Sequence, residues 1–355
     1  MTPLMLWASV LVATLPPNEQ GQPQNYSHAT LCANRSSICA VLLDVPLACT
    51  SSACPILFCL HGFGGSNLRY PDLCGLQAHK SGWIGVYPQG DPLAVRPDGS
   101  LVPGWNDGQS VNPQQTLLRC KYDDFDCNLD PNDGVFIAKI VATLRTAGAS
   151  GRVYVFGQSN GADFAQRLAV NADNLALPIA GIAPQSSQLN NAPPRSAAGP
   201  YNLMQPRTSG PRVAQLSIHG TADGAIPYDG GSKFGSHIFT LFPEPASDAV
   251  WAQHNGCNGA LTSANVSLDY FPALVEADDE VRIVGEVPRY PPPPPTVKGV
   301  ATHWTWGGCP PEAPVEYYQS HGAGHLSTAG LEGQPLLAVV LDFFGRVERV
   351  RAAAA

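Results

Sequence analysis

A serine flanked by two glycines is the clearest candidate for a reactive group in this sequence. The segment Gly157-Gln-Ser159-Asn-Gly161 follows a short run of strand-forming residues and precedes a mostly apolar segment that can form a helix. A strand, a sharp turn and a helix are the context in which Gly-x-Ser-x-Gly lifts a serine hydroxyl off a sheet. Glycines at both flanks let the backbone pass close to its neighbours. The pattern predicts a nucleophile, and the alternative is a turn in which Ser159 only caps the helix.

Two further polar residues follow later strands in the order that such a serine requires. Asp223 ends the segment His-Gly-Thr-Ala-Asp, and His325 ends the segment Gly-Ala-Gly-His. A serine attacks well only when an imidazole takes its proton, and the imidazole needs a carboxylate on its other nitrogen. We therefore predict Ser159, His325 and Asp223 as nucleophile, base and acid. His321 is the rival base, and His325 is preferred because it stands beyond both glycines.

A glycine-rich segment after the first buried strand supplies the remaining part of this chemistry. The segment His-Gly-Phe-Gly-Gly follows the apolar run Pro55–Leu60, so its amides can point into a cleft. A tetrahedral intermediate on Ser159 carries an oxyanion that needs hydrogen-bond donors. We predict the backbone amides of Phe63 and Asn160 as these donors, and the alternative for the first segment is a plain tight turn.

Apolar runs and amphipathic segments alternate along the chain and predict the scaffold for these residues. Strands are predicted at Pro55–Leu60, Gly82–Tyr87, Arg152–Phe156, Ile179–Ala183, Val213–Ile218 and Val315–Tyr318, and helices at Asn132–Ala147, after the serine, before Cys257 and at Gln334–Val350. Short apolar strands without alternation are typical of a parallel sheet that is covered on both faces. The fold class predicted is α/β, with a mostly parallel central sheet, flanking helices and long disulfide-bearing loops.

Composition divides the chain into three parts. Residues 1–18 contain the apolar run Leu4–Leu15, which has the length of a signal peptide and is too short to span a bilayer; the alternative is a buried N-terminal segment. Residues 19–54 are predicted to be a polar, loop-like segment. Residues 55–350 are predicted to be a single catalytic domain, with a surface excursion at 258–300 that has possible antiparallel strands and five consecutive prolines.

The overall charge and the cysteines bear on partners and location. A net charge of −8 argues against nucleic acid or an anionic membrane surface as a partner, and no segment is long and apolar enough for a membrane anchor. Ten cysteines favour an oxidising compartment, as do the glycosylation sequons at Asn25, Asn34 and Asn265. We therefore predict a secreted glycoprotein.

Two cysteine assignments follow from the residues themselves. Cys59 lies inside a predicted strand and is expected to be a buried free thiol. Cys120 and Cys127 are paired on proximity alone.

The predicted excursion from residue 88 to about residue 130 contains two candidate binding features. Its acidic run suggests calcium, but with Asp126 as first ligand Pro131 stands where an EF-hand loop needs glycine, so a solvated loop is favoured. Trp105 either stacks on a bound sugar or aromatic ring, which would make it a substrate-binding residue, or it plugs the core.

Several segments together resemble a known family. His-Gly-Phe-Gly-Gly, Gly-Trp-Asn-Asp-Gly, Gly-Gln-Ser-Asn-Gly-Ala, His-Gly-Thr-Ala-Asp-Gly-Ala-Ile-Pro-Tyr, Asn-Gly-Cys and Gly-Ala-Gly-His occur in this order between about Pro55 and Val347. They are similar to those of polyhydroxybutyrate-depolymerase-like esterases, which include the feruloyl and acetyl xylan esterases of carbohydrate esterase family 1. The resemblance implies an α/β-hydrolase fold and hydrolysis of carboxylic esters without a metal or cofactor.

The resemblance also assigns residues. It assigns the triad to Ser159, Asp223 and His325 and the oxyanion donors to Phe63 and Asn160. It further implies a disulfide between Cys257 and Cys309 that holds the histidine loop near the cleft. The family's histidine segment often continues as Gly-His-x-Trp-Pro-Gly, whereas here it continues as Gly-His-Leu-Ser-Thr, so substrate preference stays open.

The function hypothesis that results is a secreted serine esterase acting on feruloyl or acetyl groups of a polysaccharide, or on a small ester. Alternatives are a polyhydroxybutyrate or other polyester depolymerase, a serine peptidase, and a noncatalytic carbohydrate-binding protein of the same fold. The absence of a gating domain in this sequence disfavours the peptidase. The sequence does not predict an oligomeric state.

Overall fold

The computed structural model describes residues 24–26, 41–50, 53–69, 74, 76–95, 99–107, 133–190, 205–206, 210–231, 241–271 and 296–354. The predicted signal peptide, the acidic run, the Cys120–Cys127 pair, the five prolines and the sequon at Asn34 lie outside these residues.

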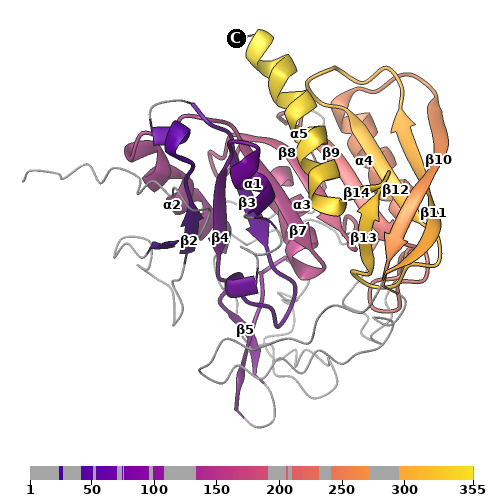
Figure 1. Cartoon of the computed structure of the whole chain (residues 1–355), viewed down its shortest axis with the longest axis horizontal. Coiled ribbons are helices and arrows are strands. Elements are labelled where there is room, and N and C mark those ends of the chain that lie inside the picture. Colours follow the sequence, from indigo (N-terminus) through magenta and orange to yellow (C-terminus); the bar gives the residue numbers. More distant parts are fainter. Residues whose placement is uncertain are drawn as a thin grey trace, which may run out of the picture.

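A large sheet forms the centre of the molecule (Figure 1). Its described strands lie in the order β1 (Gln24–Tyr26), β2 (Val41–Asp44), β4 (Ile84–Pro88), β3 (Ile56–Leu60), β7 (Val153–Gln158), β8 (Ile179–Gln185), β9 (Ala214–Gly220), β12 (Val315–Ser320), β11 (Val297–Trp306), β10 (Leu261–Tyr270), β13 (Thr328–Leu331) and β14 (Gln334–Pro335). The strands from β4 to β12 in this order are parallel. The neighbours β2 and β11 are antiparallel to them. This is the arrangement of an α/β-hydrolase, and β7 lies near its middle.

Helices cover both faces of this sheet. One face carries α2 (Asp133–Thr146), α3 (Asn160–Val170) and α4 (Glu244–Asn255), and the other carries α1 (Leu76–Lys80) and α5 (Leu336–Ala353). Side chains alternate across a strand, and β7 shows the consequence: Val153 and Val155 pack in one core, whereas Tyr154 and Phe156 pack in the other. A strand that is apolar on both sides therefore holds the middle of the sheet, where both faces are covered.

Smaller elements connect these layers. They are the 3-10 helices η1 (Leu47–Thr50) and η2 (Asn67–Arg69) and the two-stranded sheet of β5 (Pro92–Val95) and β6 (Leu101–Pro103). The last two lie within the predicted excursion after residue 88. In the 258–300 region, β10 pairs antiparallel with β11. The pairing runs from Leu261 opposite Trp306 to Tyr270 opposite Val297, so the possible antiparallel strands are present.

The predicted strands of the parallel sheet and the helices that flank it are confirmed, with end points that shift by a few residues. Residues 19–54 differ from the expectation. Val41 and Leu43 are buried in β2, which pairs with β4 at the edge of the parallel strands. The segment of residues 38–45 is apolar except for Asp44, so the sequence does carry a strand signal that the loop-like interpretation overlooked. The loop-like interpretation is therefore wrong for Gln24–Tyr26 and Val41–Asp44, which both belong to the central sheet.

Three disulfides join cysteines in the described ranges: Cys49–Cys54, Cys59–Cys74 and Cys257–Cys309. None of the cysteines in these ranges is free. The prediction of a free thiol at Cys59 is wrong. Cys59 and Cys74 are both buried in the core beneath α1 and α5. Their Cα atoms lie 6.7 Å apart, within the range that a disulfide can span.

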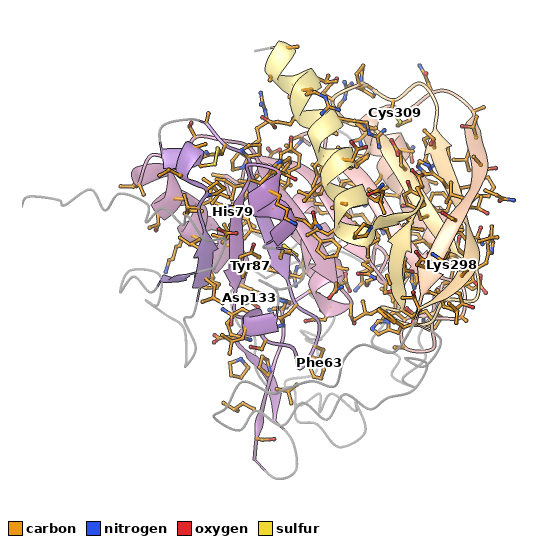
Figure 2. The ribbon with its side chains drawn as sticks, in the orientation of Figure 1. Phe63, His79, Tyr87, Asp133, Lys298 and Cys309 are labelled. Atoms are coloured by element: carbon orange, nitrogen blue, oxygen red, sulfur yellow. A yellow bond between two sulfur atoms is a disulfide. The ribbon has the colours of Figure 1, made fainter. Side chains whose placement is uncertain are left out.

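The Cys257–Cys309 bridge has the expected partners but a different place. Cys257 follows the carboxyl end of α4, and Cys309 precedes the amino end of β12. Figure 2 shows Cys309 at the opposite end of the molecule from Phe63. The bridge therefore ties α4 and the β10–β11 hairpin together at the amino edge of the parallel strands, and the implied role beside the histidine loop is wrong.

Candidate active site

Ser159 occupies a strained turn between β7 and α3. Its backbone has φ 53° and ψ −123°, a conformation that costs energy for a residue with a Cβ. A Cβ on Gly161 would collide with the carbonyl oxygens of His61 and Leu60, and one on Gly157 would collide with the carbonyl of Gly161. The turn is therefore sharp enough to exclude side chains at both flanks. The capping alternative fails, because the Ser159 side chain makes no cap hydrogen bond to α3.

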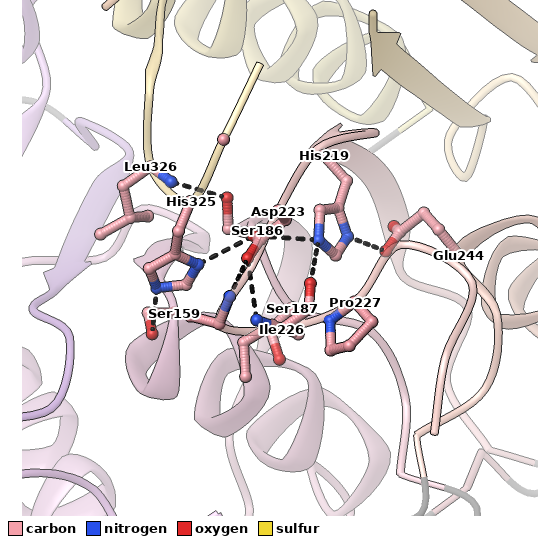
Figure 3. Close-up of polar contacts among 12 residues, drawn as sticks. Ser159, Ser186, Ser187, His219, Asp223, Ile226, Pro227, Glu244, His325 and Leu326 are labelled. Atoms are coloured by element: carbon pink, nitrogen blue, oxygen red, sulfur yellow. Dashed lines mark hydrogen bonds and ion pairs between the residues drawn. The ribbon is translucent and has the colours of Figure 1, made fainter. Parts of the chain in front are cut away.

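The structure brings the three predicted polar side chains into one hydrogen-bonded line (Figure 3). Ser159 Oγ lies 2.9 Å from His325 Nε2, and His325 Nδ1 lies 2.8 Å from Asp223 Oδ2. They come from segments after β7, β12 and β9, and the carboxyl ends of parallel strands meet at one edge of a sheet. His321 does not take part, because its Nε2 bonds the hydroxyl of Thr302 at 2.8 Å.

The carboxylate of Asp223 is held by four hydrogen bonds. Oδ1 accepts the amides of Ala225 at 2.9 Å and Ile226 at 2.8 Å, and Oδ2 faces His325 at 2.8 Å and His219 at 3.2 Å. Burial opposes ionisation, but hydrogen bonds and charge from both histidines hold the pKa of Asp223 well below its usual range. The acid is therefore ionised and fixed in orientation.

A second histidine stands behind the acid. His219 is buried, and its Nδ1 lies 2.7 Å from Oε2 of Glu244, the first residue of α4. Its Nε2 faces both Asp223 Oδ2 and the carbonyl of Ile226, at 2.9 Å from the latter. Burial opposes the charged form, but hydrogen bonds to Asp223 and Glu244 raise the pKa of His219 to about 10. Sequence reasoning missed these two residues. The signal was His219 itself, four residues before the acid, whereas Glu244 gave none.

The amide of Phe63 is oriented by its own peptide unit. The carbonyl of Gly62 accepts His61 Nδ1 at 2.8 Å and the amide of Gly65 at 3.0 Å. His61 Nε2 accepts the amide of Gly90 at 2.9 Å, so the ring proton is on Nδ1. In a trans peptide the C=O and N–H point in opposite directions. Fixing the Gly62 carbonyl therefore fixes the direction of the Phe63 N–H.

The two predicted oxyanion donors lie on segments that touch at the turn around Ser159, which is called the elbow below. A Cβ on Gly62 would stand 3.3 Å from Ser159 Cβ, which places the peptide before Phe63 beside the serine. Asn160 is the first residue of α3, and its amide is one of the four at a helix start without a partner inside the helix. Both predicted donors are thus carried by backbone next to the hydroxyl of Ser159.

Trp105 is a core residue, so the prediction that it binds substrate is wrong. Its side chain is 0% exposed and stacks on Phe164 of α3, with ring centroids 5.2 Å apart. Its Nε1 donates to the carbonyl of His61 at 2.9 Å. An indole enclosed in this way fills the space between the segment that begins at His61 and helix α3, and it cannot contact a ligand.

The Asn160 side chain fastens this tryptophan to the elbow. Its Oδ1 accepts the Trp105 amide at 2.7 Å, and its Nδ2 donates to the Trp105 carbonyl at 2.9 Å and to Asp107 Oδ2 at 2.8 Å. Beneath it, burial and the charge of Asp107 raise the pKa of Asp163 well above its usual value. The side chain of Asn160 is therefore occupied by structure, which leaves its backbone amide for the site.

Within the described ranges, no three His, Cys, Asp or Glu side chains are grouped as metal ligands. No helix in that part of the chain is both long and apolar enough to cross a membrane.

Comparison with known proteins finds likeness at the level of structure. No protein-family model and no curated protein sequence matches the chain. Acetyl xylan esterase from Aspergillus awamori has a TM-score of 0.49 and 14% identity, over 92% of this chain and 99% of that one. Poly(3-hydroxybutyrate) depolymerase from Bordetella parapertussis has a TM-score of 0.41 and 16% identity, over 66% and 79%. S-formylglutathione hydrolase from Agrobacterium tumefaciens has a TM-score of 0.35 and 14% identity, over 65% and 81%.

The strand order and the turn after β7 define the class. The chain has the α/β-hydrolase fold, with a serine at the turn that this fold uses for a nucleophile. Esterases and a polyester depolymerase are among the solved structures that it resembles.

Proposed function

We propose that the chain is a serine esterase in which Ser159, His325 and Asp223 form the catalytic triad. The observation that carries this proposal is the unbroken line of hydrogen bonds from Ser159 Oγ to the buried Asp223 carboxylate. Its distances are those expected between a nucleophile, a base and the group that orients the base. The strained elbow and the glycines around it support the same assignment.

The geometry supports a two-step acyl transfer. His325 Nε2 takes the hydroxyl proton as Ser159 Oγ bonds the ester carbonyl carbon, and the amides of Phe63 and Asn160 stabilise the oxyanion. When the intermediate collapses, the C–O bond to the alcohol breaks and His325 returns the proton to the departing oxygen. A water molecule then attacks the acyl group by the same route, which releases the acid and restores Ser159.

The substrate class that we propose is an acylated polysaccharide or a small ester. The support is the set of segments that resembles the feruloyl and acetyl xylan esterases, from His-Gly-Phe-Gly-Gly to Gly-Ala-Gly-His. Trp105 is buried and cannot stack on a feruloyl ring, which favours an acetyl group as the acyl part. A polyester such as polyhydroxybutyrate is the alternative substrate.

We also propose that the protein is secreted. Three disulfides in the described ranges and the apolar run Leu4–Leu15 support an oxidising compartment reached through a signal peptide. Asn265 of the sequon lies exposed on β10, where a glycan can be attached.

A fluorophosphonate probe tests the chemistry directly. The wild type should label stoichiometrically and Ser159→Ala should not, because the probe bonds only an activated serine. Ser263→Ala, at an exposed position of β10, is the control and should label as the wild type does. If the wild type does not label, or if Ser159→Ala still labels, the proposed triad is wrong. A wild type that never labels and hydrolyses no ester would instead fit the noncatalytic alternative.

Hydrolysis of acetylated xylan, methyl ferulate and polyhydroxybutyrate tests the substrate class. We expect kcat/KM to be highest for the acetyl ester. Preferential hydrolysis of polyhydroxybutyrate would transfer the chain to the polyester alternative, and preference for methyl ferulate would contradict the choice of an acetyl group.

A further inference from the structure

The acid of the proposed triad has a second partner that the triad mechanism does not use. Asp223 Oδ2 lies between His325 Nδ1 at 2.8 Å and His219 Nε2 at 3.2 Å, and the far side of His219 meets Glu244 Oε2 at 2.7 Å (Figure 3). The side chains of His219 and Asp223 are 0% exposed and that of Glu244 is 1% exposed. Ser159, His325, Asp223, His219 and Glu244 therefore form one continuous line from the surface of the site into the core.

The partners of His219 determine where its protons lie. Among the residues that the structure describes, Nε2 faces two acceptors, the Asp223 carboxylate and the carbonyl of Ile226, so it must carry a proton. In the same set of residues, Nδ1 faces the carboxyl group of Glu244, so a proton must also lie between these two atoms. A neutral imidazole beside an ionised Glu244 would set a lone pair against an acceptor in the core. The geometry thus requires one proton on Nε2 and a second proton between Nδ1 and Oε2 of Glu244.

Glu244 is placed so that this proton belongs to the imidazole. It is the first residue of α4, preceded by Pro243, and its own amide donates to the carbonyl of Tyr228 at 2.9 Å. The amino end of a helix stabilises a carboxylate. Hydrogen bonds to Asp223 and Glu244 raise the pKa of His219 to about 10, so at neutral pH the shared proton lies on the imidazole, and the positive ring faces Asp223.

The remaining titratable groups around His219 do not reverse this arrangement. Tyr228 meets the ring edge-on, with centroids 5.6 Å apart, and burial raises the pKa of its phenol, as it does for Tyr317 of β12. Asp248, one turn along α4 from Glu244, is buried, and burial with the charge of Glu244 raises its pKa well above the usual value. These groups are favoured in their neutral forms, so the carboxyl groups that bond His219 directly are those of Asp223 and Glu244.

We propose that His219, held by Glu244, is a positioning residue that keeps a positive charge behind Asp223 and so weakens the attraction of that carboxylate for a protonated His325. This rests on the proposed function, because it concerns the base of that site. The positive charge on His219 partly offsets the electrostatic attraction between the Asp223 carboxylate and a protonated His325. It also fixes Oδ2 against rotation, so the same oxygen always meets His325 Nδ1.

The pH dependence of kcat/KM on an acetyl ester tests the effect on His325. In His219→Gln the amide nitrogen can still donate towards Ile226 and Asp223, but the charge is gone. The Asp223 carboxylate then attracts the protonated ring of His325 more strongly. The acid limb of the profile should therefore move up by about one pH unit. Below that limb kcat/KM should fall about tenfold relative to the wild type, with a smaller change on the plateau.

His303→Gln is the matched control for that measurement. His303 also pairs with a buried glutamate, Glu316, at 2.9 Å, but it lies on β11 and stacks on Tyr318. Its acid limb should coincide with that of the wild type. An acid limb that stays in place in a folded His219→Gln variant overturns the proposal, and so does an equal shift in His303→Gln.

Nuclear magnetic resonance of the histidine rings provides a test that needs no activity. At neutral pH the wild type should show both ring N–H protons of His219, as an imidazolium. Glu244→Gln lets a neutral amide donate to Nδ1, so the pKa of His219 should fall towards the ordinary value of about 6.5 and the Nδ1 proton should disappear above it. This variant also carries the test if His219→Gln does not fold.

The two sets of outcomes separate this inference from the proposed function. An imidazolium at His219 in a protein without esterase activity would sink the proposed function alone. A neutral His219 in the wild type at neutral pH, in an active enzyme, would sink this inference alone.

Discussion

The two halves of the proposed site are held by different forces. On the nucleophile side, Ser159 and the amide of Phe63 are placed by a strained turn, by glycines without room for a Cβ and by hydrogen bonds between neutral groups such as His61 and Gly62. On the acid side, Asp223 is placed by the backbone amides of Ala225 and Ile226 and by hydrogen bonds from two histidines, one of which pairs with Glu244. The nucleophile side depends on backbone shape, whereas the acid side also depends on charge.

This difference predicts different sensitivities. A rigid backbone arrangement should fail when a single carbon atom is added, and it should change little with pH. An arrangement of ionised groups should tolerate changes of shape better than changes of charge, and it should respond to pH. Substitutions that alter only one of these properties can therefore break or sharpen the comparison.

The largest expected effect is on the acid side, from a change that keeps shape and removes charge. Asp223→Asn can present an amide N–H where His325 Nδ1–H now donates, which favours the wrong tautomer of the base. We expect kcat on an acetyl ester to fall by about 10⁴-fold with the fold retained. Asp173→Asn, at an exposed turn after α3, is the control and should keep full activity. A loss below tenfold in Asp223→Asn would contradict the triad assignment.

The next effect is on the nucleophile side, from the addition of one methyl group. Gly161→Ala forces a Cβ against the carbonyl oxygens of His61 and Leu60, and overpacking of this kind costs about 1–3 kcal/mol or more. Urea unfolding should show this loss together with a loss of activity. Gly345→Ala in α5 is the control, because its Cβ would have ordinary space and helix interiors favour alanine by about 0.5–1 kcal/mol. Equal stability of the two variants would contradict the tight elbow.

A smaller effect separates the two roles of Asn160. Asn160→Ala removes the side chain that bonds the amide and the carbonyl of Trp105 and the carboxylate of Asp107. It keeps the backbone amide of residue 160. Buried groups left without partners should lower the free energy of unfolding by about 1–3 kcal/mol. The kcat should fall less than for Asp223→Asn, measured on the same ester below the unfolding temperature. A loss of kcat as large as that for Asp223→Asn would show that the side chain, not the amide, serves the site.

A gradual effect, spread over several pH units, is the pH dependence of stability that arises from His219. Its folded pKa of about 10 lies above the ordinary value of about 6.5, so its stabilising contribution is complete below about pH 6.5 and is lost as pH rises through about 10. Wild type should therefore lose its stability advantage over His219→Gln between these two values. Urea unfolding of both proteins at pH 6, 8 and 10 measures this. An advantage that grows with pH would contradict the sign of the shift.

Much of the site was predictable because its signals are local. Ser159 and its two glycines lie within five residues, and the turn that they form depends on the chain's own backbone. Asp223 and His325 each follow an apolar strand, and parallel strands deliver their carboxyl ends to one edge whatever the details of packing. The α/β fold follows from the same alternation of apolar strands and helices.

Features that depend on contacts between distant segments were not predictable. The sequence left Trp105 open between ligand stacking and the core, and only its contact with Phe164 decides for the core. Cys59 meets Cys74 only because both point into the core beneath α1 and α5.

The sequence by itself therefore determined the order and kind of the reactive groups, since these are properties of short segments. The tertiary structure alone decided that Glu244 stands behind His219, because that contact joins the start of α4 to the end of β9 across 25 residues. A charge in a core has consequences only through the groups that surround it. Those groups are chosen by packing, which no local pattern encodes.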